Sequence, residues 1–456
     1  MTRVLALDIG TSSVRAVVHD ERGRPVQGES AQTKYEPTHG PDGQADFDAD
    51  HLVDATREAI EKTTRRHDGI SAVGTSCFWH GLLAVDEHDR AITRLVTWRD
   101  LRSAGAADAL RALLDAEEVH RRTGAFIHPS YWPAKLAWLR AEHPDTFAGA
   151  YRFLSFSDYL YGRLTGSTAT SLSMASATGL LNQQTGRWDE ELLEVLGLTT
   201  ERLPEISGEP VEHEGRLWLP AIGDGAASNL GAGATTADRA VLMIGTSGAL
   251  RTVHEAERPE PRPRLFLYRL DERRVVEGGA LSDGGNVFAW LERTLQLEDT
   301  GGIAELAPGG HGLSFLTLLG GERSPNWNAR ARGALSGLSF DTTPADLLQA
   351  ALEGVAFRFA ELADLMPEVR EIVAAGHALS VDGDWVQILA DVLERPLAVS
   401  GVEEASARGA AVAALERLGF EAEPAPIRRI VEPRPERFPA LREARARQRD
   451  LYDAVT

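Results

Sequence analysis

Two short turns, about half the chain length apart, carry residue types that bind phosphate. Residues 9–20 and 244–255 both begin Ile-Gly-Thr-Ser and share a later Val-His pair at matching positions. Glycine lets backbone amides approach a ligand closely, and threonine and serine hydroxyls donate hydrogen bonds to phosphate oxygens. The sequence therefore predicts two phosphate-binding turns, formed by Gly10, Thr11, Ser12, Gly245, Thr246 and Ser247.

A carboxylate stands just before the first of these turns. Asp8 follows the apolar run Val4–Leu7, and a carboxylate beside phosphate donors holds Mg²⁺ directly or through water. The second copy has Met243 in this place. One carboxylate and two donor turns would therefore suit a nucleotide–Mg²⁺ complex held between two halves of the chain. The structural alternative is a strand-end aspartate that is satisfied by backbone N–H groups.

A second candidate carboxylate is Asp224, within the small-residue segment Ala221–Gly231. An aspartate in such a turn before a helix is most often an N-cap. Phosphoryl transfer also needs one carboxylate that orients the attacking hydroxyl and accepts its proton. The neighbours of Asp224 are small enough to let a substrate reach it, so both interpretations stay open.

The turns need strands on either side. Each follows an apolar run, Val4–Leu7 or Val241–Met243, which is typical of a β-hairpin. The repeat predicts two similar domains, residues 1–236 and 237–456, although common hairpins also resemble each other by chance. Strands that alternate with helices indicate an α/β protein. We expect strands at Ile70–Thr75, Leu82–Val85 and Val369–Ala375, helices at His51–Arg66, Pro133–Glu142, Ala345–Leu365, Asp384–Leu393 and Ala405–Leu418, a surface loop at Glu255–Arg264 and a charged helix ending the tail Glu421–Thr456.

Composition excludes several classes of protein. Of the 456 residues, 43% are apolar and 25% charged, as in ordinary folded proteins. The net charge of −20 argues against nucleic acid or an anionic membrane as the main partner, because both require a basic face. The single cysteine, Cys77, excludes an intrachain disulfide and a multi-cysteine zinc site. Without a long apolar run or a signal peptide, we expect a cytoplasmic protein.

Several motifs resemble those of the FGGY family of carbohydrate kinases, within the actin-like ATPase superfamily. Leu7–Ser12 resembles the family's first phosphate loop, and Gly333–Leu338 followed by Asp346–Glu353 meets its C-terminal signature. The first-domain signature around Lys135–Leu139 matches except at Trp132, where the family prefers Pro, Ser or Thr. The resemblance implies two ribonuclease-H-like domains of the actin/hexokinase type, with ATP and a sugar or polyol in the cleft between them.

The resemblance also implies roles for individual residues. Asp224 would be the catalytic base, and Asp8 would organise Mg²⁺ or its waters. The segment Val373–Ser380 resembles the adenosine loop, with Ala375 in place of the first glycine and Gly376 as the matching one. The segment Ala405–Ala411 resembles the helix start that closes this pocket, although ordinary packing of small residues explains it equally well.

The substrate side is expected in the first domain. His80 matches a family histidine over the sugar, and Trp79 replaces the methionine that often precedes it. Asp100 matches the Trp–x–Asp–x–Arg segment, whose aspartate reaches sugar hydroxyls. His128 and Lys135 complete the predicted sugar contacts. The alternative for each is an ordinary core or ion-paired residue.

Four stretches look like the gluconokinase branch of the family. They are Ile127–Pro129, Ala175–Leu180, Gly223–Gly231 with Ser228 and Asn229, and Asp283–Trp290 with Asn286. Gluconate is an anion, so we expect a local cation from among His128, Lys135, Arg99 and Arg323. Alternatives are a xylulokinase or another ketose or polyol kinase, a simple ATPase, and a non-enzymatic actin-like ATP-binding or sugar-sensing protein. A homodimer is an open expectation.

Overall fold

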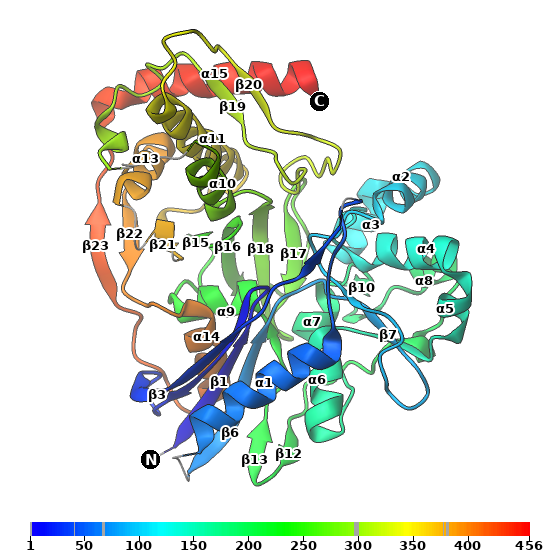
Figure 1. The fold of residues 1–456 in the computed structure, drawn as a ribbon. Coiled ribbons are helices and arrows are strands. Elements are labelled where there is room, and N and C mark those ends of the chain that lie inside the picture. Colours follow the sequence, from blue (N-terminus) through cyan, green and yellow to red (C-terminus); the bar gives the residue numbers. More distant parts are fainter. Residues whose placement is uncertain (1, 41, 66–68, 296–300, 377, 380–382) are drawn as a thin grey trace.

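The computed structural model describes residues 2–40, 42–65, 69–295, 301–376, 378–379 and 383–456. Within these residues the chain forms two seven-stranded sheets with helices packed around and between them (Figure 1). Four small two- and three-stranded sheets flank them.

The first large sheet has the strand order β12-β13-β6-β1-β2-β3, and β14 also pairs with β6. These strands are β1 (Arg3–Ile9), β2 (Ser13–His19), β3 (Pro25–Lys34), β6 (Ile70–Cys77), β12 (Val211–His213), β13 (Arg216–Trp218) and β14 (Ile222–Gly223). The second has the order β17-β18-β16-β15-β21-β22-β23. Its strands are β15 (Arg239–Ile244), β16 (Gly248–Glu255), β17 (Phe266–Arg269), β18 (Arg274–Leu281), β21 (Glu371–Ala375), β22 (Leu397–Ser400) and β23 (Ile427–Val431).

The two sheets repeat one arrangement. In each, an antiparallel hairpin (β1–β2 or β15–β16) lies beside a parallel strand (β6 or β21). The third strand then joins the outer side of the hairpin, as β3 on β2 and β18 on β16. Both hairpins predicted from the repeated turns are therefore confirmed. The division at residue 236 stays a prediction.

The remaining strands are short and form the four small sheets. They are β4 (Thr38–His39), β5 (Ala45–Phe47), β7 (Leu83–Val85), β8 (Leu95–Val96), β9 (Arg152–Leu154), β10 (Leu181–Asn182), β11 (Arg187–Trp188), β19 (Ser314–Leu316) and β20 (Ala334–Ser336).

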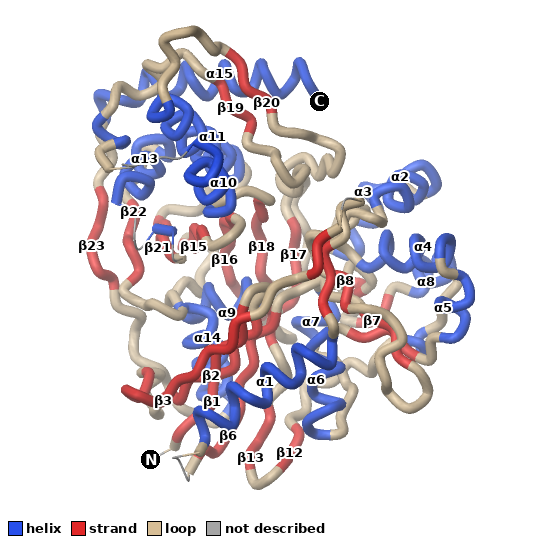
Figure 2. Tube along the Cα trace, viewed as in Figure 1, coloured by secondary structure: helices blue, strands red, loops and turns tan. Residues whose placement is uncertain are grey.

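Helices pack around and between the sheets, as Figure 2 shows. They are α1 (Ala49–Thr64), α2 (Ala104–Leu113), α3 (Ala116–Thr123), α4 (Trp132–Glu142), α5 (Pro144–Gly149), α6 (Phe156–Thr165), α7 (Leu172–Ser176), α8 (Glu190–Leu196), α9 (Asp224–Gly231), α10 (Gly285–Leu295), α11 (Pro344–Asp364), α13 (Gly383–Leu393), α14 (Ala405–Arg417) and α15 (Phe438–Val455). The predicted helices agree with these bounds to within about two residues. For α11 the reason is local, because Thr343 and Asp346 form a capping box and Pro344 opens the helix.

Two helices, α9 and α14, lie between the large sheets (Figure 1). They cross with backbones in contact, because an added Cβ at Gly409 would lie 1.7 Å from the carbonyl oxygen of Ala227, and one at Gly231 would lie 1.8 Å from that of Ala405. Alanines of α14 also pack on β1 and β6 of the first sheet. A helix from the second half of the chain thus fixes the position of α9, which begins at Asp224.

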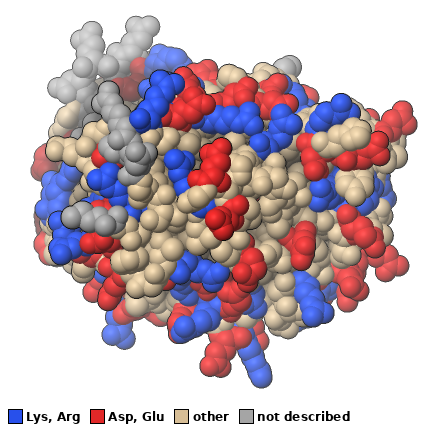
Figure 3. Space-filling model, turned by 90° about the horizontal axis from the view of Figure 1, so that it is seen from below, with Lys and Arg blue, Asp and Glu red and all other residues tan. Residues whose placement is uncertain are grey.

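No helix among the described residues is long and apolar enough to span a bilayer. On the face seen in Figure 3, acidic and basic side chains are interspersed.

Candidate active site

Both Gly-Thr-Ser turns open onto one large cavity of about 2340 Å³. The first half of the chain contributes Asp8 and Ser12 to its lining, and the second contributes Gly245, Thr246 and Gly376. Segments far apart in the sequence therefore converge on one space. A nucleotide and its acceptor would be held there between two sheets.

The turns are tight and leave hydroxyl groups exposed. The amide of Gly10 donates to the carbonyl of Ser13, and the amide of Gly245 donates to that of Ser247, each over 3.0 Å. The side chains of Ser12 and Thr246 are exposed. These are the donors that a phosphate chain needs.

Gly376 packs closely against the backbone of Ile244, just before the second turn. Its φ is +106°, and an added Cβ would lie 2.3 Å from the carbonyl oxygen of Ile244. Glycine is therefore required at this position of the predicted adenosine loop. Ala375 also lines the cavity, as do Ala405 and Ser406 at the start of α14. His377 and Ser380 of the same predicted loop lie outside the described residues.

Asp8 is a buried carboxylate that interacts electrostatically with the half-buried carboxylate of Asp224. Asp8 accepts a hydrogen bond from Ser76 at 3.2 Å and lies 3.9 Å from Arg15. Burial raises the pKa of Asp8 to about 7, against the opposing charge of Arg15, and the charge of Asp224 adds to this rise. Burial also raises the pKa of Asp224, and the charge of Arg251 opposes that rise.

The N-cap interpretation of Asp224 is wrong. Gly223 occupies the N-cap of α9, and no side chain makes a cap bond there. The carboxylate of Asp224 instead accepts from the amide of Gly225 at 2.8 Å. Asp224 is half-buried, does not line the cavity itself, and interacts electrostatically with two lining residues, Asp8 and Arg323.

Comparison with known proteins explains this arrangement. Models of the N-terminal and C-terminal domains of the FGGY family of carbohydrate kinases match residues 3–212 and 240–416. The gluconokinase of Bacillus subtilis (strain 168) is 31% identical to this chain, covering 91% of this chain and 88% of that protein. The chain belongs to the FGGY family of carbohydrate kinases.

Solved structures of other kinases have the same fold. A ligand-bound xylulose kinase from Lactobacillus acidophilus superimposes with a TM-score of 0.91 at 28% identity, covering 100% of this chain and 98% of that one. A gluconate kinase from the same organism gives 0.90 at 28% identity, covering 99% and 98%. Membership of the family supports an ATP-dependent sugar kinase and leaves its substrate open.

Of the residues predicted to contact the sugar, some line the cavity and others pack behind it. Trp79 does not line the cavity. Its indole donates to the carbonyl of Ser173 at 3.2 Å, and its ring fills the space where Gly223 would carry a Cβ, only 1.7 Å from the nearest ring atom. Trp79 therefore supports the turn that presents Asp224.

His80 and Lys135 form one unit in this kinase. His80 has a left-handed φ of 69°, and its Nδ1 lies 2.7 Å from the carbonyl oxygen of Ala177. Since a carbonyl only accepts, Nδ1 carries the proton, and burial holds the pKa of His80 well below its usual value. The Nζ of Lys135 donates to the carbonyl of His80 at 2.5 Å and to that of Val96 at 3.4 Å. Lys135 therefore holds the His80 backbone and has no place in the cavity lining.

His128 lines the cavity as a neutral ring. Its Nε2 donates to the carbonyl of Glu322 at 3.2 Å, and its Nδ1 accepts from the amide of Ser130 at 3.2 Å. Burial and the charge of Arg323 lower the pKa of His128 to about 3. His128 therefore provides no positive charge for an anionic substrate.

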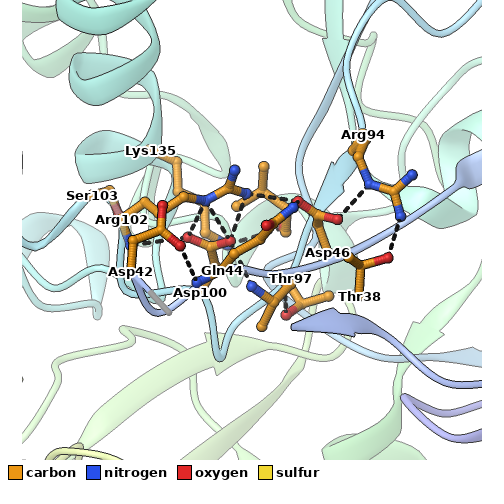
Figure 4. Close-up of polar contacts among 12 residues, drawn as sticks. Thr38, Asp42, Gln44, Asp46, Arg94, Thr97, Asp100, Arg102, Ser103 and Lys135 are labelled. Carbon is orange, nitrogen blue, oxygen red and sulfur yellow. Dashed lines mark hydrogen bonds and ion pairs between the residues drawn. The ribbon is translucent and has the colours of Figure 1, made fainter. Parts of the chain in front are cut away.

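Asp100 belongs to an internal ion network, shown in Figure 4. Its carboxylate accepts from Arg102 at 2.7 Å and from the amide of Ala45 at 2.9 Å. Arg102 also reaches the buried Asp46 at 2.8 Å. This network ties β5 to the loop that follows β8. Asp100 does not line the cavity.

Two buried arginines, Arg323 and Arg251, interact electrostatically with Asp224, and of these two Arg323 lines the cavity whereas Arg251 does not. Arg323, one of the predicted cations, is buried and lines the cavity, as does the more exposed Arg99. Arg251 on β16 was not predicted. The signal in the sequence is a single charge within the otherwise uncharged segment Ala249–Val253, which indicates a buried residue with a specific task.

Proposed function

We propose that this kinase transfers the terminal phosphoryl group of ATP to D-gluconate and forms 6-phosphogluconate. The observation that carries the proposal is Arg323, a buried cation on the cavity wall near Asp224. A sugar acid has a carboxylate for such a cation, and a neutral ketose has none.

The guanidinium of Arg323 is fixed in position and keeps hydrogen-bonding capacity for an anion. One guanidinium nitrogen donates to the carbonyl of Leu281 at 2.7 Å, and the guanidinium lies 4.2 Å from the centre of the Trp98 ring. Its Nε has no hydrogen-bond partner among the described residues. A buried, charge-assisted contact with a carboxylate is worth ~1.5–3 kcal/mol. Arg323 would therefore favour an acid over a neutral sugar.

The same geometry suits the chemistry of transfer. Asp224 would orient the attacking hydroxyl of the substrate and accept its proton. Amides and hydroxyls of the turns at Gly10–Ser12 and Gly245–Ser247 would donate to the phosphates. Asp8, at the end of β1, projects one carboxylate into the cavity.

Asp8 also fits the expected Mg²⁺. The described residues contain no cluster of three or more metal-binding side chains. Mg²⁺ typically uses one or two carboxylates and completes its shell with water and substrate phosphates, which agrees with a single aspartate. When bound, the ion would neutralise charge on the phosphate oxygens.

The relatives support gluconate and also keep an alternative. Two gluconokinases, from Bacillus subtilis (strain 168) and Bacillus licheniformis, are 31% and 30% identical to this chain. The xylulose kinase of Staphylococcus xylosus is 26% identical over the same share of this chain. A xylulose kinase structure superimposes as well as the gluconate kinase does. Xylulose is therefore the second candidate. A cytoplasmic location and a homodimer stay predictions.

An ATP-consumption screen with product analysis tests the proposal. The substrates are gluconate, xylulose, ribulose, fuculose, glycerol and erythritol, each with Mg²⁺. Phosphorus NMR of the product separates sugar phosphorylation from simple ATP hydrolysis. We expect a phosphomonoester on the terminal hydroxyl of gluconate. Turnover of neutral sugars alone would contradict the proposal, and release of free phosphate alone would indicate an ATPase.

A further inference from the structure

Arg251 is a buried arginine on β16, beside the helix that begins at Asp224. Its guanidinium lies over Gly225, where an added Cβ would be 2.0 Å from Nη1. A Cβ on Gly278, opposite it on β18, would lie 2.8 Å from the Arg251 Cα. Two glycines thus leave room for this one side chain.

Two polar residues of α9 hold Arg251 in place. The amide of Asn229 donates to the Arg251 carbonyl at 2.8 Å, and a guanidinium nitrogen of Arg251 donates to the hydroxyl of Ser228 at 3.4 Å. In the sequence, Ser228 and Asn229 belong to a stretch that resembles the gluconokinase branch. In the structure both residues form hydrogen bonds with Arg251.

The positive charge of Arg251 has no counter-ion in direct contact. Among the described residues no carboxylate makes an ion pair with Arg251 or with Arg323, and the Nε of each lacks a hydrogen-bond partner. Burial lowers the pKa of both guanidinium groups, and each lies within electrostatic reach of Asp224 and of Tyr268. Two buried, unpaired cations are costly to fold unless a ligand supplies negative charge.

The surroundings of the two arginines suit the polar end of a sugar acid. The hydroxyl groups of Tyr131 and Tyr268 are 2.5 Å apart, and the His80 ring packs edge-on against both tyrosines. Hydroxyl groups and a neutral imidazole are partners for sugar hydroxyls, whereas guanidinium groups are partners for a carboxylate.

We infer that Arg251 is a specificity-determining residue, which together with Arg323 receives the carboxylate of a sugar-acid substrate. This inference rests on the proposed function, because it assigns the recognition of the acid to a second residue of the same site. The rival role for Arg251 is purely local, namely to keep Asp224 ionised.

The test compares two substrates that differ in one group. D-gluconate carries a carboxylate where D-gluconamide carries a neutral amide. In Arg251→Met we expect kcat/KM for gluconate to fall roughly 10–150-fold, the range of one charge-assisted contact. The loss should lie mainly in KM. For gluconamide we expect a smaller loss, because only the effect of Arg251 on Asp224 acts there, so the ratio of gluconate to gluconamide kcat/KM should fall at least about tenfold. Arg251→Lys keeps the charge and should retain most of the preference for gluconate.

Two further variants keep the test interpretable. Ser228→Ala leaves Arg251 in place but removes its hydroxyl partner, so we expect a smaller loss that is again confined to gluconate. Arg202→Met is the control for the loss of an arginine elsewhere in the chain, because the Arg202 guanidinium donates to the backbone carbonyls of Phe147 and Ala150 and does not line the cavity. It should leave the ratio of the two substrates unchanged.

The outcomes separate this inference from the proposed function. If the wild type phosphorylates gluconate but Arg251→Met leaves the gluconate-to-gluconamide ratio unchanged, the inference fails alone. Equal losses on both substrates, with a shifted pH profile of kcat, would assign Arg251 to Asp224 and also overturn it. If the wild type phosphorylates only neutral sugars, both fail. If it prefers a different sugar acid and Arg251→Met removes that preference, the inference stands without gluconate.

Discussion

At the crossing of α9 and α14, the effect of replacing Gly409 by alanine can be worked out from the distance between the two helices. A methyl group added at Gly409 would lie 1.7 Å from the carbonyl oxygen of Ala227, whereas ordinary contact begins at 3.4 Å. The two helices must therefore separate by roughly the difference or tilt apart. Overpacking of this kind costs ~1–3 kcal/mol of stability.

The same displacement should reach the catalytic group, because Asp224 is the first residue of α9. Misplacement of a reacting group by about 1 Å costs ~10²-fold in rate. We therefore expect Gly409→Ala to unfold at lower urea concentration and to lose about 10²-fold in kcat/KM. Urea titration followed by tryptophan fluorescence, together with steady-state kinetics, measures both effects.

The control is Gly105→Ala on α2, where an added Cβ meets no atom within 4 Å. Alanine is the better helix former by ~0.5–1 kcal/mol, so this variant should keep its activity and be slightly more stable. A Gly409→Ala protein with a normal urea midpoint would refute the packing argument. A destabilised protein with normal kcat/KM would refute the link between α14 and Asp224.

Three further predictions concern single residues. Asp224→Asn should lower kcat by ~10²–10⁴-fold, the range for a positioned acid–base group, with little change in ATP affinity by calorimetry; near-normal turnover would refute its role as base. Gly376→Ala should raise KM for ATP at least tenfold and leave that for the sugar unchanged, since its Cβ would lie 2.3 Å from the Ile244 carbonyl oxygen; an unchanged KM for ATP would place the nucleotide elsewhere. The pKa of His128 is lowered to about 3 from 6.5, so the unfolded chain binds this proton first and stability falls as the pH drops below about 6.5. In urea titrations, His128→Asn should remove up to ~1.4 kcal/mol of that loss per pH unit, and parallel stability profiles would contradict this.

The features predicted correctly from the sequence depend on neighbouring residues. A hairpin follows from an apolar run, a Gly-Thr-Ser turn and a second apolar run, so both were predicted with their turns at Gly10 and Gly245. The start of α11 was predictable for the same reason, since Pro344 lies in the first turn and Thr343 caps it. Local chemistry fixes such elements before any long-range contact forms.

The sugar side depends on distant partners, which the sequence does not reveal. Lys135 and Asp100 were expected at the substrate, but Lys135 donates to the His80 and Val96 carbonyls, and Asp100 is taken up by Arg102. Whether a charged residue faces a ligand or an internal partner depends on packing between segments. Arg251 was missed for the same reason, since only the fold places it beside Asp224.

The most direct test of the proposed substrate is the ratio of kcat/KM for D-gluconate to that for D-xylulose, measured on the wild-type protein with saturating ATP and Mg²⁺. Arg323, together with Arg251, predicts a ratio of at least about ten in favour of gluconate, the lower end of one charge-assisted contact. A ratio of ten or more in favour of xylulose would contradict the choice of substrate and leave the carbohydrate kinase intact.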